Sequence, residues 1–241
     1  MALFDSIRAG ASGSTEGYQI ERSIRMDGRD DQTNFRFTPS SQGDRRKFTL
    51  SWWMKAGHLV SGDQNNNYLF EARRGSNNPQ FAISFSHERL LCGGVTGGSQ
   101  SYLVITQRVF RDPTNWMHFV VIHDTQNSTS SDRIRIYVNG ERITNFDNSS
   151  YPSSGFQTAW NTNEAEMNMG RTFYGSGNHN FDGYIAEFHN ISSLALTPDN
   201  FGETDSITGQ WIPKKYTGAD GDASCRCYLK FTDNSNNTAA T

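Results

Sequence analysis

The sequence contains little cysteine, no long hydrophobic run and no extended cluster of basic residues. Three of its 241 residues are cysteines, Cys92, Cys225 and Cys227. An odd number that includes one C-x-C pair does not form a disulfide framework, and two cysteines so close on one strand would close a strained ring. A zinc site would need further ligands nearby. We therefore expect reduced thiols, as in a protein that folds in a cytoplasm.

The missing hydrophobic and basic runs exclude two classes of partner. No apolar stretch reaches the length of a transmembrane helix, and the first residues, MALFDSIRAGASGS, lack the apolar core of a secretory signal. The net charge is -3, and the short basic run at 45–47 opens a predicted strand. We therefore expect neither insertion into a membrane nor binding to nucleic acid.

Aromatic, glycine and amide residues are abundant instead. Hydrophobic residues make up 34% of the chain, but it contains 16 Phe, 9 Tyr and 5 Trp. Each of these rings buries a large area, so a core can form with few aliphatic side chains. The 22 Gly and many Asn and Ser residues are typical of a protein with many turns. This composition favours a loop-rich β protein.

Short segments of β pattern, separated by turn signals, follow one another along the chain. In KFTLSWWMK, Phe48, Leu50, Trp52 and Met54 fall on one face of the predicted strand and Trp53 on the other. A dozen such strands without a long helical period predict an all-β fold, an antiparallel β-sandwich of two packed sheets. The predicted strands are 18–26, 47–55, 67–72, 80–85, 89–93, 101–110, 116–122, 133–138, 141–144, 165–171, 181–191 and 227–231.

The stretch NWMHFVVIHDTQNSTSSDRIRIYVNGERIT, residues 115–144, predicts strand, polar surface loop, strand, tight turn and strand. Asn139-Gly140 is a strong signal for a two-residue hairpin turn, since both residues need positive φ. Such a turn places Ile136 opposite Ile143, and it buries the face of Ile134, Ile136 and Val138. The strand WMHFVVI is apolar on both faces, which predicts a central position in its sheet.

The predicted domain organisation has three parts. Residues 1–17 form a Gly/Ser-rich arm, residues 18–204 the sandwich, and residues 205–241 an irregular connector (205–225), a closing strand (227–231) and a polar tail. A helical turn is predicted only near residue 198, with Thr197 as its cap and Pro198 at its first position. The tail TDNSNNTAAT is similar to a linker, so we expect the native chain to continue past Thr241 or to be cut there.

Four stretches taken together carry a family resemblance. SIRMDG (23–28), FTLSWWMK (48–55), NWMHFVVIHD with RIRIYVNGERI, and FDGYIAEFHNISSLALTPDNF (181–201) follow the order of motifs in the laminin-G-like branch of the concanavalin A-like lectin/glucanase superfamily. The resemblance spans residues 18–203. It implies a concanavalin A-like jelly roll.

A second resemblance lies mostly outside this pattern. MALFDSIRAGASG, RVFRDPTNWMHFVV and FGETDSITGQWIPKKYTG are similar to stretches of bacteriophage virion proteins that carry such a domain. It implies a virion protein made in the cytoplasm of a bacterial host. We predict a non-enzymatic structural role in a tail fibre or capsid-attached appendage, as a homotrimer together with other virion proteins. The main alternative is a glycan-binding adhesion module for host-surface polysaccharide.

Glycoside hydrolysis is the remote alternative. Glucanases of this superfamily place acids at E-x-D-x-E or E-x-D-x-x-E spacing on one strand. The nearest features are Glu164 with Glu166, which lack a third acid, and Asp182 with Glu187, whose odd spacing separates them on a strand. By resemblance, Glu187 occupies a position common in non-catalytic members. We predict no catalytic residue.

We predict no cofactor and no metal site. His118 and His123 have odd spacing on one strand, so they cannot share a metal ion. Oxygen-rich loops at 61–67, 123–132, 145–150 and 232–237 leave Ca²⁺ possible, as in relatives of this domain. None of them has a defined ligand motif, so solvated loops are the favoured interpretation.

Two groups of residues are candidates for binding. Aromatic and amide side chains near loops could form a platform for a sugar, although most of them could equally belong to the core or to subunit contacts. These candidates are Trp53, Tyr68, Asn65, Asn66, Asn67, Trp160 and Tyr174. Leu3, Phe4 and Ile7 of the arm would be buried only on assembly, unless the arm is a disordered leader.

Overall fold

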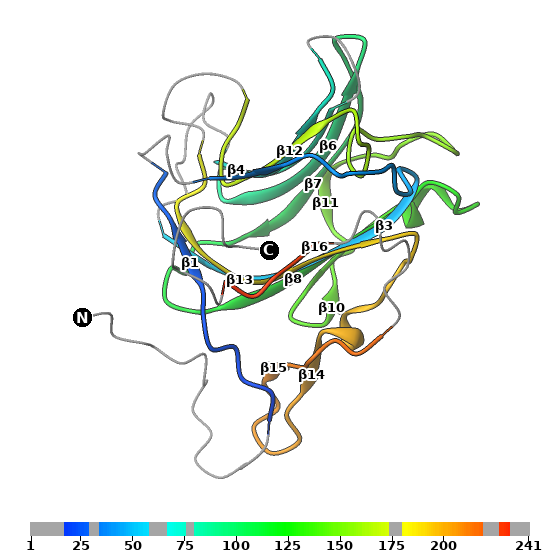
Figure 1. Cartoon of the computed structure of the whole chain (residues 1–241). Coiled ribbons are helices and arrows are strands. Elements are labelled where there is room, and N and C mark those ends of the chain that lie inside the picture. The colour runs from blue at the N-terminus through cyan, green and yellow to red at the C-terminus, as the bar shows by residue number, and fades with distance from the viewer. Residues whose placement is uncertain are drawn as a thin grey trace.

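The computed structural model describes residues 17–28, 34–57, 67–75, 80–173, 180–218 and 227–231. Two antiparallel sheets stack face to face, which confirms the predicted β-sandwich (Figure 1). The predicted arm residues Leu3, Phe4 and Ile7, the predicted polar tail and Cys225 lie outside the described residues, as do Asn65, Asn66 and Tyr174. Within the described residues, no helix has the length and apolar character needed to cross a membrane.

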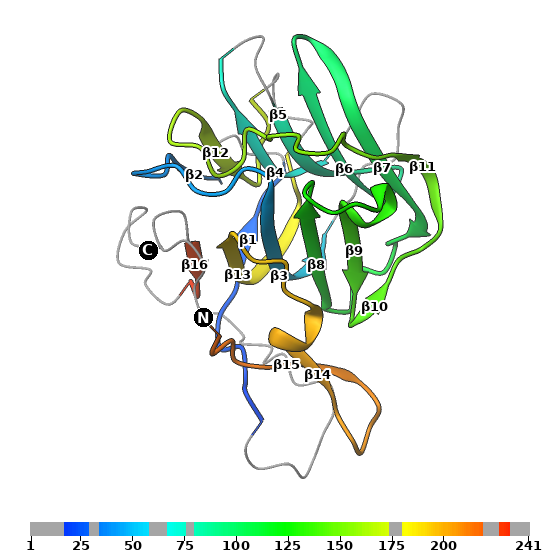
Figure 2. The ribbon, with the colours of Figure 1, turned by 90° about the vertical axis from the view of Figure 1, so that its right-hand side faces the viewer.

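The first sheet has the strand order β1-β13-β3-β8-β9-β10, and β16 also pairs with β13. Figure 2 shows these strands side by side. Their bounds are β1 Ile24–Met26, β3 Lys47–Ala56, β8 Met117–Asp124, β9 Ile134–Val138, β10 Glu141–Arg142, β13 Gly183–Ser192 and β16 Cys227–Leu229.

The second sheet has the order β11-β7-β6-β5-β4-β12-β2. Its strands are β2 Phe35–Phe37, β4 Asn67–Arg73, β5 Gln80–Ser86, β6 Arg89–Thr96, β7 Ser99–Val109, β11 Phe146–Ser150 and β12 Glu166–Met169. Two short 3-10 turns, η1 Ser130–Asp132 and η2 Pro198–Asn200, and a small two-stranded sheet of β14 Gly202–Thr204 and β15 Trp211–Pro213 complete the described structure.

Rings fill the space between the two large sheets. Phe48, Leu50, Trp52 and Met54 are fully buried on the inner face of β3, as their alternation predicts. The Trp52 ring is stacked on Phe119 of β8 with 5.4 Å between the ring centroids. Stacked and edge-to-face aromatic pairs of this kind add to the stabilisation that comes from buried apolar area.

The outer face of the first sheet is also covered. Val120 and Ile122 of β8 pack there against Ile191 and Phe201. A further cluster joins Trp53 and Ala186 to Ile20 from the N-terminal segment. Coverage on both sides explains why every residue of β8 is buried, and it confirms the predicted central position of this strand.

The hairpin between β9 and β10 follows its predicted register. Arg142 pairs with Tyr137, and the Ile143 N–H donates to the Ile136 carbonyl over 2.8 Å. Asn139 and Gly140 have φ of 50° and 81°. The Asn-Gly turn therefore fixes the register as the sequence predicts.

Several predictions of local structure were wrong. Within the strand predicted at 18–26, only residues 24–26 form a strand, β1. Residues 17–20 instead lie across the outer face of the first sheet. The predicted connector at 205–225 contains β15, which pairs with β14. The predicted helical turn is confirmed as η2, which Thr197 precedes and Pro198 begins, and only the predicted cap is wrong, because the Thr197 side chain makes no capping hydrogen bond. β2 and β11 were not predicted. β2 is short and stands apart from the other strand patterns in the sequence, and β11 is short and polar.

Candidate binding groove on the second sheet

The outer face of the second sheet carries a groove across β4, β5, β6 and β7. Strand register brings outward side chains into rows, because directly opposite residues of an antiparallel pair point to the same side. One row runs from Glu71 through Ala82 and Gly93 to Leu103. The groove has a volume of about 210 Å³ and is lined by Tyr68, Glu71, Gln80, Ala82, Ser84, Leu91, Gly93, Gly94, Val95, Gln100, Tyr102 and Leu103.

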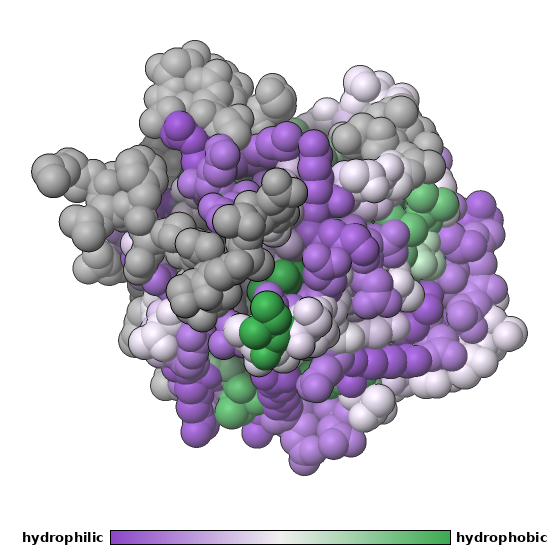
Figure 3. All heavy atoms as spheres, turned by 90° about the horizontal axis from the view of Figure 1, so that it is seen from below, coloured by the Kyte–Doolittle hydropathy of each residue, from purple (hydrophilic) through white to green (hydrophobic). Residues whose placement is uncertain are grey.

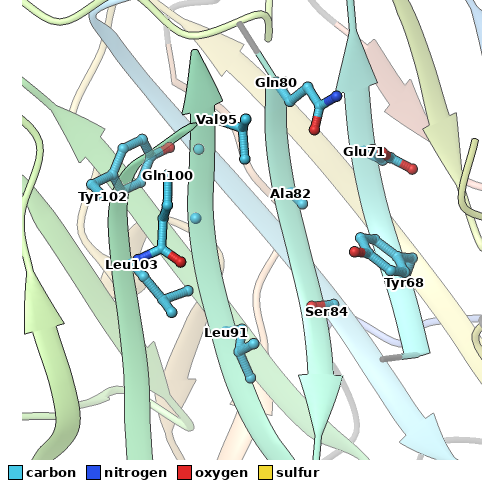
Figure 4. Close-up of a pocket in the computed structure, with 12 residues that line it drawn as sticks. Tyr68, Glu71, Gln80, Ala82, Ser84, Leu91, Val95, Gln100, Tyr102 and Leu103 are labelled. Carbon is cyan, nitrogen blue, oxygen red and sulfur yellow. The ribbon is translucent and has the colours of Figure 1, made fainter. Parts of the chain in front are cut away.

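The groove exists because small residues occupy its centre. Ala82 and Gly93 leave a low floor, and the longer side chains of Tyr68, Gln80 and Leu103 stand around it (Figure 4). A Cβ atom added at Gly93 would lie 3.1 Å from Leu103 Cδ1 and would extend into this space. The small residues that face each other on β5 and β6 therefore create the groove.

The Tyr102 ring closes the groove from below. It lies in the core and is fully buried, but it approaches Gly94 so closely that a Cβ atom there would be 2.3 Å from the ring. The Tyr102 hydroxyl has no hydrogen-bond partner within the described part of the chain, and burial raises the pKa of this phenol well above 10.0. Gly94 is required here by the close approach of the ring.

Within the described part of the chain, Glu71 is the only acidic residue that lines the groove. It is 1% exposed, and its Oε2 accepts the Phe173 N–H over 2.8 Å. Burial raises the pKa of the Glu71 carboxyl above its usual value, while the hydrogen bond from Phe173 opposes that shift. The loop after β12 thus holds the carboxyl group in place at one end of the groove.

The rest of the lining is uncharged. Ser84, Gln80 and Gln100 supply hydroxyl and amide groups, while Tyr68 and the aliphatic walls supply apolar surface. Apolar walls with a few oriented polar groups are typical of ligand sites. Among the described residues, no Lys, Arg or His lines this groove, so its chemistry fits an uncharged ligand with several hydroxyl groups.

The four described residues that were predicted to bind glycan do not lie together. Tyr68 lines the groove, but Asn67 is 1% exposed and belongs to the opposite face of β4. Trp53 is 4% exposed, and its ring is stacked on His118 at 4.9 Å on the outer face of the first sheet. Trp160 is 1% exposed, and its indole N–H donates to Asn190 Oδ1 over 3.1 Å. Glycan binding by Tyr68 stays a prediction.

The acidic residues considered for glycosidase chemistry are held by cations or tyrosines. Glu164 pairs with Arg74, and Glu166 lies 3.4 Å from Arg36. Asp182 pairs with Arg25 over 2.7 Å between Oδ1 and Nη2. Glu187 accepts hydrogen bonds from two tyrosine hydroxyls on the outer side of the first sheet. The groove contains none of these four acids.

The two histidines of β8 lie on opposite faces, as their odd spacing predicts. His123 is stacked on Phe48 in the core at 4.8 Å. His118 lies on the outer face, where its Nδ1 accepts the Trp211 indole N–H over 3.0 Å and its Nε2 is 2.9 Å from Ser51 Oγ. Burial, and less strongly the nearby His189, lower the pKa of His118 to about 3. Among the described residues, no cluster of three metal-binding side chains occurs.

Comparison with known proteins gives the same fold. The structure is similar to a native heptameric SAP-like pentraxin from Limulus polyphemus, with a TM-score of 0.53 and 15% identity over 83% of this chain and 92% of that chain. It is also similar to domains LG4-5 of the mouse laminin alpha1 chain, with a TM-score of 0.51 and 11% identity over 90% of this chain and 49% of that one.

A third similar structure is domain 4 of AbnA, an extracellular GH43 arabinanase from Geobacillus stearothermophilus, in complex with arabinotriose. Its TM-score is 0.50, with 18% identity over 81% of this chain and 82% of that chain. At such low sequence identities, these structural similarities establish a shared fold and nothing further. A search of curated proteins found no match. The family model described as concanavalin A-like lectin/glucanases superfamily matches residues 27–200, and the chain therefore belongs to this family.

Proposed function

We propose that this chain is a non-enzymatic binding module that holds an uncharged, hydroxyl-rich ligand, such as a neutral oligosaccharide, in the groove of the second sheet. The observation that carries this proposal is the low floor of Ala82 and Gly93 among amide, hydroxyl and tyrosine side chains. The tyrosine ring offers a flat apolar surface, and the amides offer both donors and acceptors. The similar domain whose structure is in complex with arabinotriose supports the proposal through its fold.

A variant that fills the groove tests this directly. Ala82→Leu adds a branched side chain at a half-buried outward position of β5. We expect it to weaken binding more than about tenfold, a loss of about 1.4 kcal/mol, in calorimetric titrations with a sugar first found on a glycan array. Ser131→Leu adds the same side chain at an exposed position of the 3-10 turn η1 and should leave binding unchanged. Equal binding by both variants would exclude the groove.

The absence of catalysis is part of the same proposal. The four acids considered above pair with cations or tyrosines, and none of them lines the groove. We expect the protein to leave any polysaccharide that it binds uncut, as measured by chromatography of the reducing ends. If products do form, Glu164→Gln and Glu166→Gln identify whether these two residues produce them.

We also propose that the module is a structural component of a bacteriophage virion and assembles as a homotrimer. This rests on the resemblance of residues 1–13, 108–121 and 201–218 to virion proteins. In the view from below, the surface is mainly hydrophilic with separate small apolar patches (Figure 3). Light scattering of the purified chain and immunogold labelling of the particles test the two parts. A monomer would refute the trimer, and unlabelled particles would refute the virion assignment.

A further inference from the structure

A second and larger cavity lies away from the groove, where three parts of the chain meet. The loop between β7 and β8, the turn of the β9–β10 hairpin and the β14–β15 hairpin surround a volume of about 800 Å³. This lies within the range of about 300–1,000 Å³ that is typical of sites for small ligands.

The cavity has an apolar floor and two indole walls. Phe110, Met117 and Val138 line it, and each of them is at most 7% exposed. Trp116 and Trp211 also line it, and both remain half-buried. A half-buried indole offers an apolar face to a ligand and keeps a polar N–H for a hydrogen bond.

The Trp211 wall is fixed in position by its surroundings. Its indole N–H donates to His118 Nδ1, and its ring packs closely against two glycines. A Cβ atom at Gly140 would be 2.6 Å from the ring, and one at Gly202 would be 2.5 Å from it. The ring can therefore pack here only because both of these residues lack a side chain. A ligand finds this surface already formed, which reduces the entropy lost on binding.

The rim of the cavity is polar, and its charges nearly cancel. Two arginines, Arg108 and Arg111, line it together with Asp112, Glu141 and Asp199. The Asp112 carboxylate accepts hydrogen bonds from Thr114 and Asn115, so it is used within its own loop. The rim therefore carries two basic and three acidic side chains, Arg111 is paired with Glu88, and Gln210 adds an exposed amide. A rim of mixed charge favours a neutral ligand over a phosphate or a metal ion.

We propose that this cavity is a second carbohydrate site, which takes one or more rings of a neutral oligosaccharide. A sugar ring has an apolar face for the indole walls and equatorial hydroxyl groups for the amides and charges of the rim. This site is separate from the groove, and its existence does not depend on the function proposed for the groove.

Tryptophan fluorescence gives a readout specific to this site, because two tryptophans line the cavity and none lines the groove. The probes are arabinotriose, maltotriose, cellotriose and chitotriose, titrated to millimolar concentration. We expect a saturable change in emission with at least one of them. Gln210→Ala should weaken this response about fivefold, the equivalent of one hydrogen bond of about 1 kcal/mol. Thr204→Tyr, which fills the cavity from exposed β14, should abolish it.

Gln100→Ala is the matched control, since Gln100 is also an exposed glutamine but lines the groove. It should leave the fluorescence response unchanged, as should Ala82→Leu. The absence of a saturable response to all four sugars would overturn this proposal, and so would a response that Ala82→Leu abolishes. Failure of the groove alone would appear as a normal fluorescence response together with calorimetric binding that Ala82→Leu does not weaken.

Discussion

Replacing Glu187 with glutamine tests the cluster that connects the two ends of the described chain. Glu187 Oε2 accepts the Tyr18 hydroxyl over 2.8 Å and the Tyr228 hydroxyl over 2.6 Å. Tyr18 belongs to the N-terminal segment and Tyr228 to β16, so one carboxylate holds both against β13. Burial, and less strongly the nearby carboxylate, raise the pKa of Tyr18 to about 12.

The expected loss of stability follows from the charge of the acceptor. A hydrogen bond to a charged group contributes about 1.5–3 kcal/mol and one between neutral groups about 1 kcal/mol. Glutamine retains a carbonyl oxygen but no charge, so two bonds each weaken by about 1 kcal/mol. We therefore expect Glu187→Gln to lower the free energy of unfolding at pH 7 by about 2 kcal/mol in urea titrations.

The effect should depend on pH in a known direction. Burial alone would raise the pKa of Glu187, but hydrogen bonds from His189, Tyr228 and Tyr18 outweigh it, so the pKa lies below its usual value of 4.5. A group with a depressed folded pKa stabilises the protein fully above its unfolded pKa, and this stabilisation is lost as the pH falls through the folded pKa. The difference between the wild type and Glu187→Gln should therefore vanish in acid.

Two comparisons make this prediction refutable. Glu203→Gln removes an exposed carboxylate that lies 3.9 Å from Lys214, and surface pairs of this kind contribute at most about 1 kcal/mol. Tyr228→Phe should cost more in the wild type than in Glu187→Gln, because the two residues are coupled. Equal stability of Glu187→Gln and the wild type at pH 7, or a difference that persists in acid, would show that the carboxylate does not act as a charged acceptor.

Three further predictions concern packing and protonation. Trp52→Ala should lower the free energy of unfolding by about 3–5 kcal/mol, measured in urea, because it empties the centre of the core; a loss under about 1 kcal/mol would contradict the packing. Gly94→Ala should destabilise by about 1–3 kcal/mol through its clash with Tyr102, whereas a Cβ atom at Gly93 meets the movable end of Leu103 at 3.1 Å and the Tyr102 carbonyl at an ordinary 3.4 Å, so Gly93→Ala should melt like the wild type. His118, with its pKa of about 3, should show no titration by NMR between pH 5 and 8, and a midpoint near 6.5 would mean that its burial is wrong.

The parts of the fold that the sequence predicts are those with a local pattern. The alternation in β3 identifies four core residues because one face of that strand meets the second sheet. The Asn-Gly turn fixes the β9–β10 register because backbone geometry at two residues decides it. Trp53 and Trp160 could not be placed in this way. Trp53 is covered by a cluster that includes Ile20, which is distant from it in the sequence. Trp160 lies in an irregular segment that has no hydrophobic period.

The candidate groove was also hidden from the sequence, except for Tyr68. Ala82 and Gly93 form its floor only because β5 and β6 pair in one register, and Gln100 reaches it from the far end of β7. Alternation does assign Ala82 to the outer face of its strand. It cannot show that two small residues become neighbours there, since that depends on which strands pair.

The position of β13 has a consequence for how the chain reaches its native state. This strand lies between β1 and β3, although it is made more than a hundred residues after both of them. During synthesis, β1 and β3 therefore have no partner along these edges until residue 192 has left the ribosome. Non-local pairing of this kind slows folding and leaves strand edges open to other chains. Expression at lower temperature, or with a chaperone present, should therefore increase the soluble yield.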